Sequence, residues 1–185
     1  GKSTLINKLL GEDRVIVSDI PGTTRDAIDT EFSYKDQDYI LIDTAGVRKK
    51  SKVKENIERY SVIRSFTGIQ RSDVCLIMID AEQGITEQDT KIAGYAHDEG
   101  KASVIIVNKW DVIEKETKTM DRYRNKIRED LSFLSYAPIL FISAKTGQRI
   151  HRIMELVNFV SNQHSMRIST GMLNEVIGEA TLLNQ

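Results

Sequence analysis

The sequence predicts an α/β protein whose sheet is mostly parallel, with one antiparallel edge strand and helices on both faces. Short apolar runs alternate along the chain with longer amphipathic runs, which is the order of strands and crossover helices in a parallel sheet. The last three apolar runs are nearly continuous in Val, Ile, Leu and Phe, as expected of strands covered on both faces. Polar motifs follow three of the strands, and ligands bind parallel sheets outside the carboxyl ends of the strands.

The element boundaries follow from these runs and from the turn residues between them. We expect strands over Thr30–Tyr34, Tyr39–Asp43, Val74–Asp80, Ser103–Asn108 and Ile139–Ser143. We expect helices over Ser3–Leu10, Val53–Ile69, Glu87–Asp98, Thr119–Leu134 and Ile150–Gln163. The polar segment 34–39 joins the first two strands as a tight hairpin, which makes one edge strand antiparallel.

The pattern divides the chain into a main domain and the start of another. A length of 185 residues fits one domain of ordinary size and a remnant of a second. The periodicity stops at His164 and restarts at Met166, and Thr170 is placed to cap a helix from Met172 to Leu183. We therefore assign residues 1–164 to the main domain and 165–185 to a linker and the start of a truncated second domain. Because no strand precedes Gly1, we expect the first strand of the main domain to be missing.

Composition excludes several classes of protein. A hydrophobic content of 40% and a charged content of 29% describe a soluble globular chain. The net charge of −1 argues against a generally polycationic nucleic-acid binder and leaves room for a local basic patch. The lone Cys75 excludes a disulfide within the chain, favours a reducing compartment and is expected to pack in the core. No apolar run approaches the roughly 20 residues of a membrane helix, and no signal peptide is visible.

Gly1-Lys2-Ser3 matches the second half of a phosphate-binding loop, Gly-x-x-x-x-Gly-Lys-Ser/Thr. Gly1 lets the backbone approach a phosphate oxygen without a Cβ in the way. Lys2 supplies positive charge to the β and γ phosphates, and the Ser3 hydroxyl is a hard ligand for Mg²⁺. The helix that begins here, with Thr4 in its first turn, directs unpaired amides and the positive end of its dipole at the same anion. Taken alone, the tripeptide fits an ordinary capped helix equally well.

Two further loops are placed to complete a site for phosphate and magnesium. Thr24, in a polar loop after the first helix, offers a hydroxyl to Mg²⁺ and an amide to the γ-phosphate. Asp43 ends a strand and would hold Mg²⁺ through a water. Gly46 would donate its amide to the γ-phosphate and change its backbone angles when that phosphate leaves. Each loop is also an ordinary turn sequence, so neither is specific by itself.

Asn108-Lys109-Trp110-Asp111 is the most specific motif of the chain. The Asp111 carboxylate can accept hydrogen bonds from N1–H and the 2-amino group of guanine, whereas adenine has an acceptor at N1 and nothing at C2. A buried site of this kind rejects the wrong partner by about 10⁴–10⁵. The stem of Lys109 can lie over the base plane, Asn108 can tie neighbouring loops together, and the loop Ser143-Ala144-Lys145 can donate an amide to guanine O6. We expect Trp110 to pack rather than to stack on nucleic acid. A surface loop of the same composition is the alternative, and the position after a buried strand argues against it.

A basic run with no acidic residue follows Val47 directly and consists of Arg48, Lys49, Lys50, Lys52 and Lys54. One interpretation is a solvated face of a loop. The other is an RNA-contacting patch whose placement depends on the bound nucleotide. The sequence leaves both open.

The order and separation of these motifs resemble translation-factor-class GTPases and, more narrowly, the Der (EngA) family of bacterial double GTPases of ribosome assembly. The resemblance is carried by Gly22-Thr23-Thr24-Arg25-Asp26, Asp43-Thr44-Ala45-Gly46-Val47 with its basic continuation, Gly84-Ile85-Thr86-Glu87-Gln88-Asp89, and Asn108-Lys109-Trp110-Asp111. The basic run followed by Glu58-Arg59-Tyr60-Ser61-Val62 is similar to the second of that family's two G domains. The tail Ser169-Thr170-Gly171-Met172-Leu173-Asn174 resembles the start of its KH-like domain. The fold implied is that of a P-loop GTPase.

The resemblance implies GTP hydrolysis coupled to maturation of the large ribosomal subunit in the bacterial cytoplasm, with rRNA and other domains of the same protein as partners. The ligands implied are GTP or GDP and Mg²⁺, with K⁺ as a further candidate because some relatives hold it through an asparagine upstream of Gly1. We expect Lys2, Thr24 and Gly46 to be catalytic and Ser3, Thr24 and Asp43 to serve the metal. The nucleotide contacts expected are Gly1, Lys2, Ser3, Thr4, Thr24, Asp43, Thr44, Ala45, Gly46, Val47, Asn108, Lys109, Trp110, Asp111, Ser143, Ala144 and Lys145.

Val47 stands where many GTPases place a glutamine that orients the attacking water, and an apolar side chain cannot do so. A catalytically weak module, in which nucleotide only sets the shape of an RNA- or ribosome-binding surface, is therefore the alternative function. A P-loop ATPase or kinase is excluded by Asn108-Lys109-Trp110-Asp111.

Overall fold

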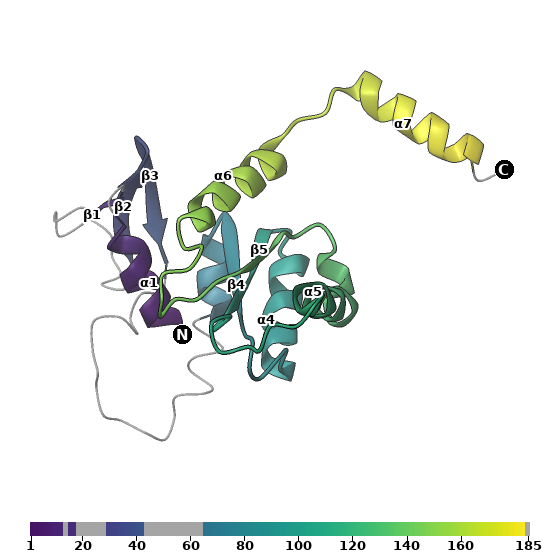
Figure 1. Cartoon of the computed structure of the whole chain (residues 1–185). Helices are drawn as coiled ribbons and strands as arrows, with labels where there is room; N and C mark the ends of the chain where they lie inside the picture. Colours follow the sequence, from purple (N-terminus) through teal and green to yellow (C-terminus); the bar gives the residue numbers. More distant parts are fainter. Residues whose placement is uncertain (13–14, 18–28, 43–64, 184–185) are drawn as a thin grey trace.

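The computed structural model describes residues 1–12, 15–17, 29–42 and 65–183 of the chain (Figure 1). The strands are β1 (Val15–Val17), β2 (Thr30–Tyr34), β3 (Gln37–Leu41), β4 (Val74–Asp80), β5 (Ala102–Asn108) and β6 (Ile139–Phe141). The helices are α1 (Lys2–Leu10), α4 (Glu87–Asp98), α5 (Thr119–Asp130), the 3-10 helix η1 (Ser132–Leu134), α6 (Arg152–Ser165) and α7 (Thr170–Leu183). Of the helix expected over Val53–Ile69, only the end lies within the described residues, where residues 65–71 are helical.

The strands form two sheets of different kinds. The order β4-β5-β6 is parallel throughout, with Asp80 paired to Asn108 at the carboxyl end. The order β1-β2-β3 is antiparallel, and no strand ladder joins the two sheets among the described residues. The α/β class is confirmed, while the antiparallel part is larger than the single edge strand predicted. Two features differ from the prediction: among the described residues β2 and β3 belong to a sheet separate from the parallel one, and β1 was not predicted. At three residues β1 is too short to show a period of its own and is defined by its pairing with β2.

The β2–β3 connection is the predicted tight hairpin. Lys35 and Asp36 have φ of 50° and 61°, so the turn has two residues in the left-handed region, as the right-handed twist of a hairpin favours. Tyr34 therefore pairs directly with Gln37, and β3 begins at Gln37 rather than at the predicted Tyr39. The Ser33 hydroxyl donates to Asp38 Oδ1 at 2.6 Å across the pair.

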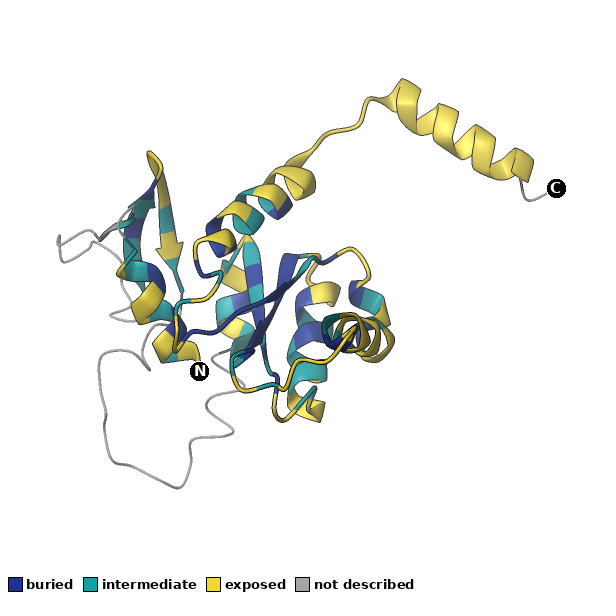
Figure 2. Ribbon diagram, in the orientation of Figure 1, coloured by how far each residue is buried: buried dark blue, intermediate teal, exposed yellow. Residues whose placement is uncertain are grey.

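β5 lies at the centre of the parallel sheet and is buried along its whole length, as its dark colour in Figure 2 shows. Successive side chains point to opposite faces. Ile105 and Val107 enter a core shared with α4 and α5, and Val104 and Ile106 enter a second core shared with α1 and α6. Helices on both faces of this sheet are thus confirmed. The antiparallel sheet packs into the second core through Phe32 and Tyr34 of β2.

Several boundaries differ from the predicted ones for local reasons. The predicted helix Thr119–Leu134 is divided, because Leu131 leaves helical geometry at φ −119° and ψ 48° and the chain continues as η1. The helix predicted from Ile150 begins at Arg152, after a loop in which Gly147 has φ 85°. The predicted cap Thr170 is instead the first residue of α7, and Ser169 Oγ accepts the Met172 N–H at 3.3 Å.

α7 stands apart from the rest of the described chain, at the end of an extended connection (Figure 1). None of its residues is buried, although its apolar side chains include Met172, Leu173, Val176 and Ile177. Across the described ranges, the apolar stretches of the helices are too short to span a bilayer.

Candidate functional site

The carboxyl ends of β4, β5 and β6 bring the polar motifs of the second half of the chain together. Asp80 and Asn108 are register partners, and Ser143 follows β6 at the same edge. Gly1 lies there too, since a Cβ built on it would stand 3.6 Å from Met78 Sδ and 4.0 Å from Asn108 Nδ2. The start of the phosphate-loop motif and the Asn-Lys-Trp-Asp motif, separated by more than half of the chain, therefore meet at one sheet edge.

Asn108 is buried at this edge and links the loops that follow the strands. Its side chain is only 4% exposed, and its Oδ1 accepts the Ala144 N–H at 2.9 Å. Its carbonyl oxygen accepts the Ala81 N–H at 3.0 Å, and the next loop residue but one, Trp110, donates its N–H to the Ile142 carbonyl at 3.0 Å. The expected tie between neighbouring loops is thus present, and it connects β4, β5 and β6.

The loop after β6 is compact and internally bonded. Ser143 is fully buried, its Oγ accepts the Thr146 N–H at 3.1 Å, and its carbonyl oxygen accepts the Gly147 N–H at 2.9 Å. Ala144 is buried and Lys145 is exposed. The Ala144 amide, part of the loop expected to donate to guanine O6, is here donated to Asn108.

Trp110 packs, as expected. It is 2% exposed, with Tyr123 edge-on at a ring-centroid distance of 5.1 Å and Phe141 at 4.5 Å. This contact anchors the loop, between Lys109 and Asp111, to α5 and β6.

Asp111 is partly exposed on the rim of the same edge. A hydrogen bond from Ser143 is the main cause that holds the pKa of Asp111 below its usual value, and the positive charges of Lys145 and Lys115 act in the same direction. The carboxylate is therefore ionised at neutral pH and can only accept hydrogen bonds. A carboxylate of this kind is suited to a partner with two adjacent N–H donors.

Lys109 makes contacts that the sequence did not predict. Its backbone is left-handed at φ 63°, and its Nζ lies 2.6 Å from Asp80 Oδ2 and 2.8 Å from Glu82 Oε2. Hydrogen bonds to Asp80 first, and then to Glu82, raise the pKa of Lys109. The sequence offers one signal for the contact between Lys109 and these two acids: Asp80 ends a predicted strand, as does Asn108, the residue before Lys109.

The phosphate half of the candidate site is described only in part. Gly1 caps α1, and Lys2 and Thr4 are exposed while Ser3 is half-buried. The first turn of α1 carries no acidic residue, so its positive end is not neutralised locally. Ser3 is the one expected magnesium ligand within the described residues, which contain no cluster of His, Cys, Asp and Glu suited to a metal. Outside the described residues lie Thr24, Asp43, Thr44, Ala45, Gly46, Val47 and the basic residues Arg48, Lys49, Lys50, Lys52 and Lys54.

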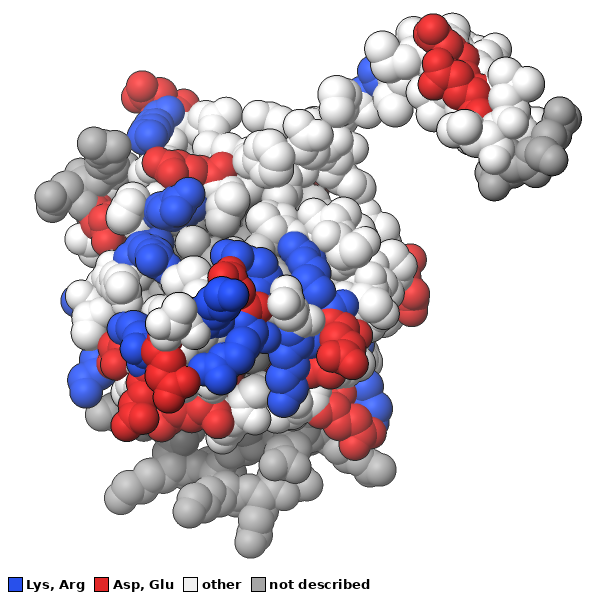
Figure 3. Space-filling view, turned by 45° about the vertical axis from the view of Figure 1, so that its right-hand side comes forward, with Lys and Arg blue, Asp and Glu red and all other residues white. Residues whose placement is uncertain are grey.

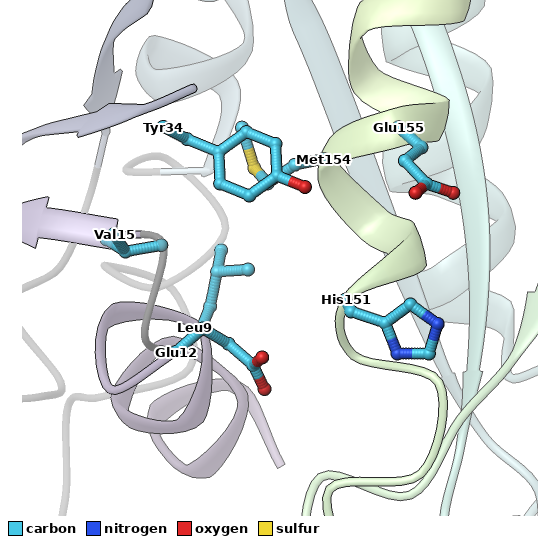
Figure 4. A pocket seen from close by; sticks show the side chains of 7 residues that line it. All are labelled: Leu9, Glu12, Val15, Tyr34, His151, Met154 and Glu155. Carbon is cyan, nitrogen blue, oxygen red and sulfur yellow. The ribbon is translucent and has the colours of Figure 1, made fainter. Parts of the chain in front are cut away.

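A cavity of about 330 Å³ lies elsewhere, between the end of α1, the antiparallel sheet and the start of α6 (Figure 4). The residues that line it are Leu9, Glu12, Val15, Tyr34, His151, Met154 and Glu155. None of the predicted site residues is among them. The candidate site is therefore the polar edge of the parallel sheet and not this cavity.

Comparison with known proteins gives a consistent result. A family model described as "50S ribosome-binding GTPase" matches residues 1–109. The chain is 63% identical over its full 185 residues to GTPase Der of Alkaliphilus metalliredigens, and 64% identical over the same length to GTPase Der of Ruminiclostridium cellulolyticum. It spans 42% of the length of each of these relatives. Among solved structures, Era in complex with MgGDPNP and a segment of 16S ribosomal RNA is 29% identical with a TM-score of 0.62, over 88% of this chain and 52% of that one.

Proposed function

The chain belongs to the family of 50S ribosome-binding GTPases and has a P-loop GTPase fold, and from this we propose that it binds guanine nucleotide with Mg²⁺ and hydrolyses GTP. We further propose that it acts within a bacterial protein that assists assembly of the large ribosomal subunit in the cytoplasm. The observation that carries the proposal is the juxtaposition of Gly1 with Asn108 at the carboxyl end of the parallel sheet.

The proposal assigns roles to the phosphate, metal and base contacts among the predicted residues. Lys2 compensates the charge of the β and γ phosphates, and the Ser3 and Thr24 hydroxyls with Asp43 hold Mg²⁺, which would supply charge stabilisation to the transferring phosphoryl group. The Gly46 amide contacts the γ-phosphate. Asp111 reads the guanine edge and the loop Ser143-Ala144-Lys145 borders O6. A water is the nucleophile, and catalysis consists of positioning and charge stabilisation.

The proposed partner is ribosomal RNA. The family description "50S ribosome-binding GTPase" and the RNA-bound Era structure support this class of partner. Figure 3 shows one face of the molecule, on whose described surface Lys and Arg are interspersed with Asp and Glu, and the overall net charge is −1. The proposed RNA contact is the basic run with no acidic residue, which consists of Arg48, Lys49, Lys50, Lys52 and Lys54. Separately, the segment 165–185 is the proposed start of a second domain.

A catalytically weak, nucleotide-dependent RNA-binding module is the second candidate function, and the apolar Val47 favours it. Multiple-turnover phosphate release by the natural protein, with Mg²⁺ and with or without K⁺, separates the two. We expect release above the uncatalysed background, and none would leave only the binding module.

The base-reading assignment is tested by Asp111→Asn in the natural protein. Loss of a charged acceptor from two guanine N–H groups should weaken GDP binding by about ten- to a hundredfold, because a hydrogen bond to a charged group contributes about 1.5–3 kcal/mol. Xanthosine diphosphate should bind more tightly to the variant, since its 2-oxo group accepts from the new amide. Asp121→Asn is the matched control, because Asp121 pairs with Arg124 on the exposed side of α5. Unchanged nucleotide preference in Asp111→Asn would refute the assignment.

A further inference from the structure

Lys109 is held by two carboxylates that belong to a different strand. Its Nζ lies 2.6 Å from Asp80 Oδ2 and 2.8 Å from Glu82 Oε2, although Lys109 follows β5 and both acids come from the end of β4. The contacts are made possible by the parallel register, which pairs Asp80 with Asn108, the residue just before Lys109.

The two carboxylates are themselves fixed. Asp80 Oδ1 accepts the backbone N–H of Glu82 at 3.0 Å, which leaves Oδ2 for Lys109. The Asp80 carbonyl oxygen accepts the Gly84 N–H at 2.9 Å, and Gly84 takes φ 72° to close this turn. Asp80 and Glu82 are therefore presented to Lys109 by a turn whose shape is set by backbone hydrogen bonds.

We infer that Asp80 and Glu82 are positioning residues for guanine nucleotide binding, which act by anchoring the ammonium of Lys109 so that its stem is ordered at the base-binding edge. The inference rests on the proposed function and extends it to two residues outside the nucleotide motifs.

Exposure argues against a role in stability alone. The side chains of Lys109, Asp80 and Glu82 are 43%, 25% and 51% exposed, and ion pairs at such sites add little to folding stability because solvent screens them. A free lysine side chain, however, has many rotamers, and a ligand that packs on its stem loses affinity to the entropy cost of restricting them. Anchoring the ammonium restricts the rotamers before the ligand binds. The backbone of Lys109 supports the same conclusion. Its φ of 63° lies in the left-handed region, and a non-glycine residue keeps this conformation where several contacts together hold it.

The experiment measures GDP affinity and dissociation rate for Asp80→Asn, Glu82→Gln and the double variant in the natural protein. Asp80→Asn retains an oxygen for the Glu82 N–H and removes the charge opposite Lys109. We expect the double variant to bind GDP about three- to tenfold more weakly, with faster dissociation, as the loss of one or two exposed charge contacts predicts. Glu87→Gln, which breaks the exposed 2.6 Å pair with Lys91 on α4, is the matched control and should leave GDP affinity unchanged.

The same substitutions in a Lys109→Met background separate positioning from a general effect. If the carboxylates act through Lys109, the double variant has no further effect on GDP affinity in that background. If the double variant lost the same GDP affinity with and without Lys109, the inference would be overturned. It would also be overturned if the wild-type protein bound GDP and the double variant bound it with the same affinity. A wild-type protein with no preference for GDP over ADP would overturn the proposed function, and the inference with it.

Discussion

Asn108 and Asp111 belong to one loop, yet they are held in different ways. Asn108 is buried, and its Oδ1 satisfies the buried amide of Ala144, so this contact is required by the fold itself. Asp111 is partly exposed, and its charge is maintained by a hydroxyl and two lysines. The loop thus combines a buried residue that fixes its shape with a partly exposed residue that carries a charged acceptor.

The charge of Asp111 leads to a prediction about pH. Because Ser143 is the main cause of its lowered pKa, Ser143→Ala should raise the pKa of Asp111 toward the ordinary value of about 3.9. A ¹³C NMR titration of the Asp111 carboxyl carbon measures this. Ser135→Ala, at an exposed position in the loop after η1, is the control and should not move it.

The effect on stability has a defined sign. A carboxyl group whose pKa is lower in the folded chain contributes stability that is fully present above the unfolded pKa of about 3.9 and is lost as the pH falls through the folded value. The difference in unfolding free energy between wild type and Ser143→Ala should therefore shrink as the pH falls below about 4. A difference that grows in this range would contradict the assigned direction.

At the scale of elements, α4 follows most closely from the sequence. Thr86 Oγ1 accepts the Asp89 N–H at 3.2 Å, and Asp89 Oδ2 accepts the Thr86 N–H at 2.9 Å, which together form a capping box. The predicted bounds Glu87–Asp98 are confirmed, and the capping box accounts for the start of the helix at Glu87. The bounds of β4 are confirmed as well, because its apolar run is long and continuous.

The cap of α4 can be tested alone. Thr86→Ala should lower the free energy of unfolding by about 1 kcal/mol, because the Asp89 N–H in the first turn of α4 loses its acceptor, Thr86 Oγ1. Thr86→Ser keeps the hydroxyl and should retain most of the stability. Urea denaturation measures both, provided that the slope with denaturant is unchanged. Equal stability of the alanine and serine variants would show that the hydroxyl contributes nothing.

Elements and contacts that depend on distant residues could not be predicted in this way. β1 is defined by its ladder with β2, and Leu131 breaks α5 in a stretch whose sequence continues the helical pattern. Within the candidate site, Asn108 and Trp110 were predicted in their packing roles because their motif is local. Asp80 and Glu82 were missed, since their contact with Lys109 arises only from the register of β4 against β5.

At the scale of the whole molecule, β5 separates two cores that support the same sheet edge. One core contains Trp110 together with α4 and α5, and the other contains residues of α1, α6 and the antiparallel sheet. The two share only the sheet between them. Because each residue of β5 is fully or nearly fully buried, the sequence of this strand shows no alternation and could not indicate which side chain enters which core.

This arrangement predicts that a destabilising substitution in one core lowers the unfolding midpoint reported by a probe in the other core. Ile106 is fully buried on the face opposite Trp110, and Ile106→Ala should lower the free energy of unfolding by about 2–5 kcal/mol through lost burial and a cavity. Trp110 is the one tryptophan of the chain, so its fluorescence reports the first core while far-UV circular dichroism reports all helices. We expect both signals to shift to the same lower urea midpoint, because a sheet shared by two cores should unfold as one unit. Ile177→Ala in the exposed helix α7 is the control, with a change within about 0.5 kcal/mol. Separate midpoints for fluorescence and circular dichroism in Ile106→Ala would show that the two cores unfold independently and that β5 does not couple them.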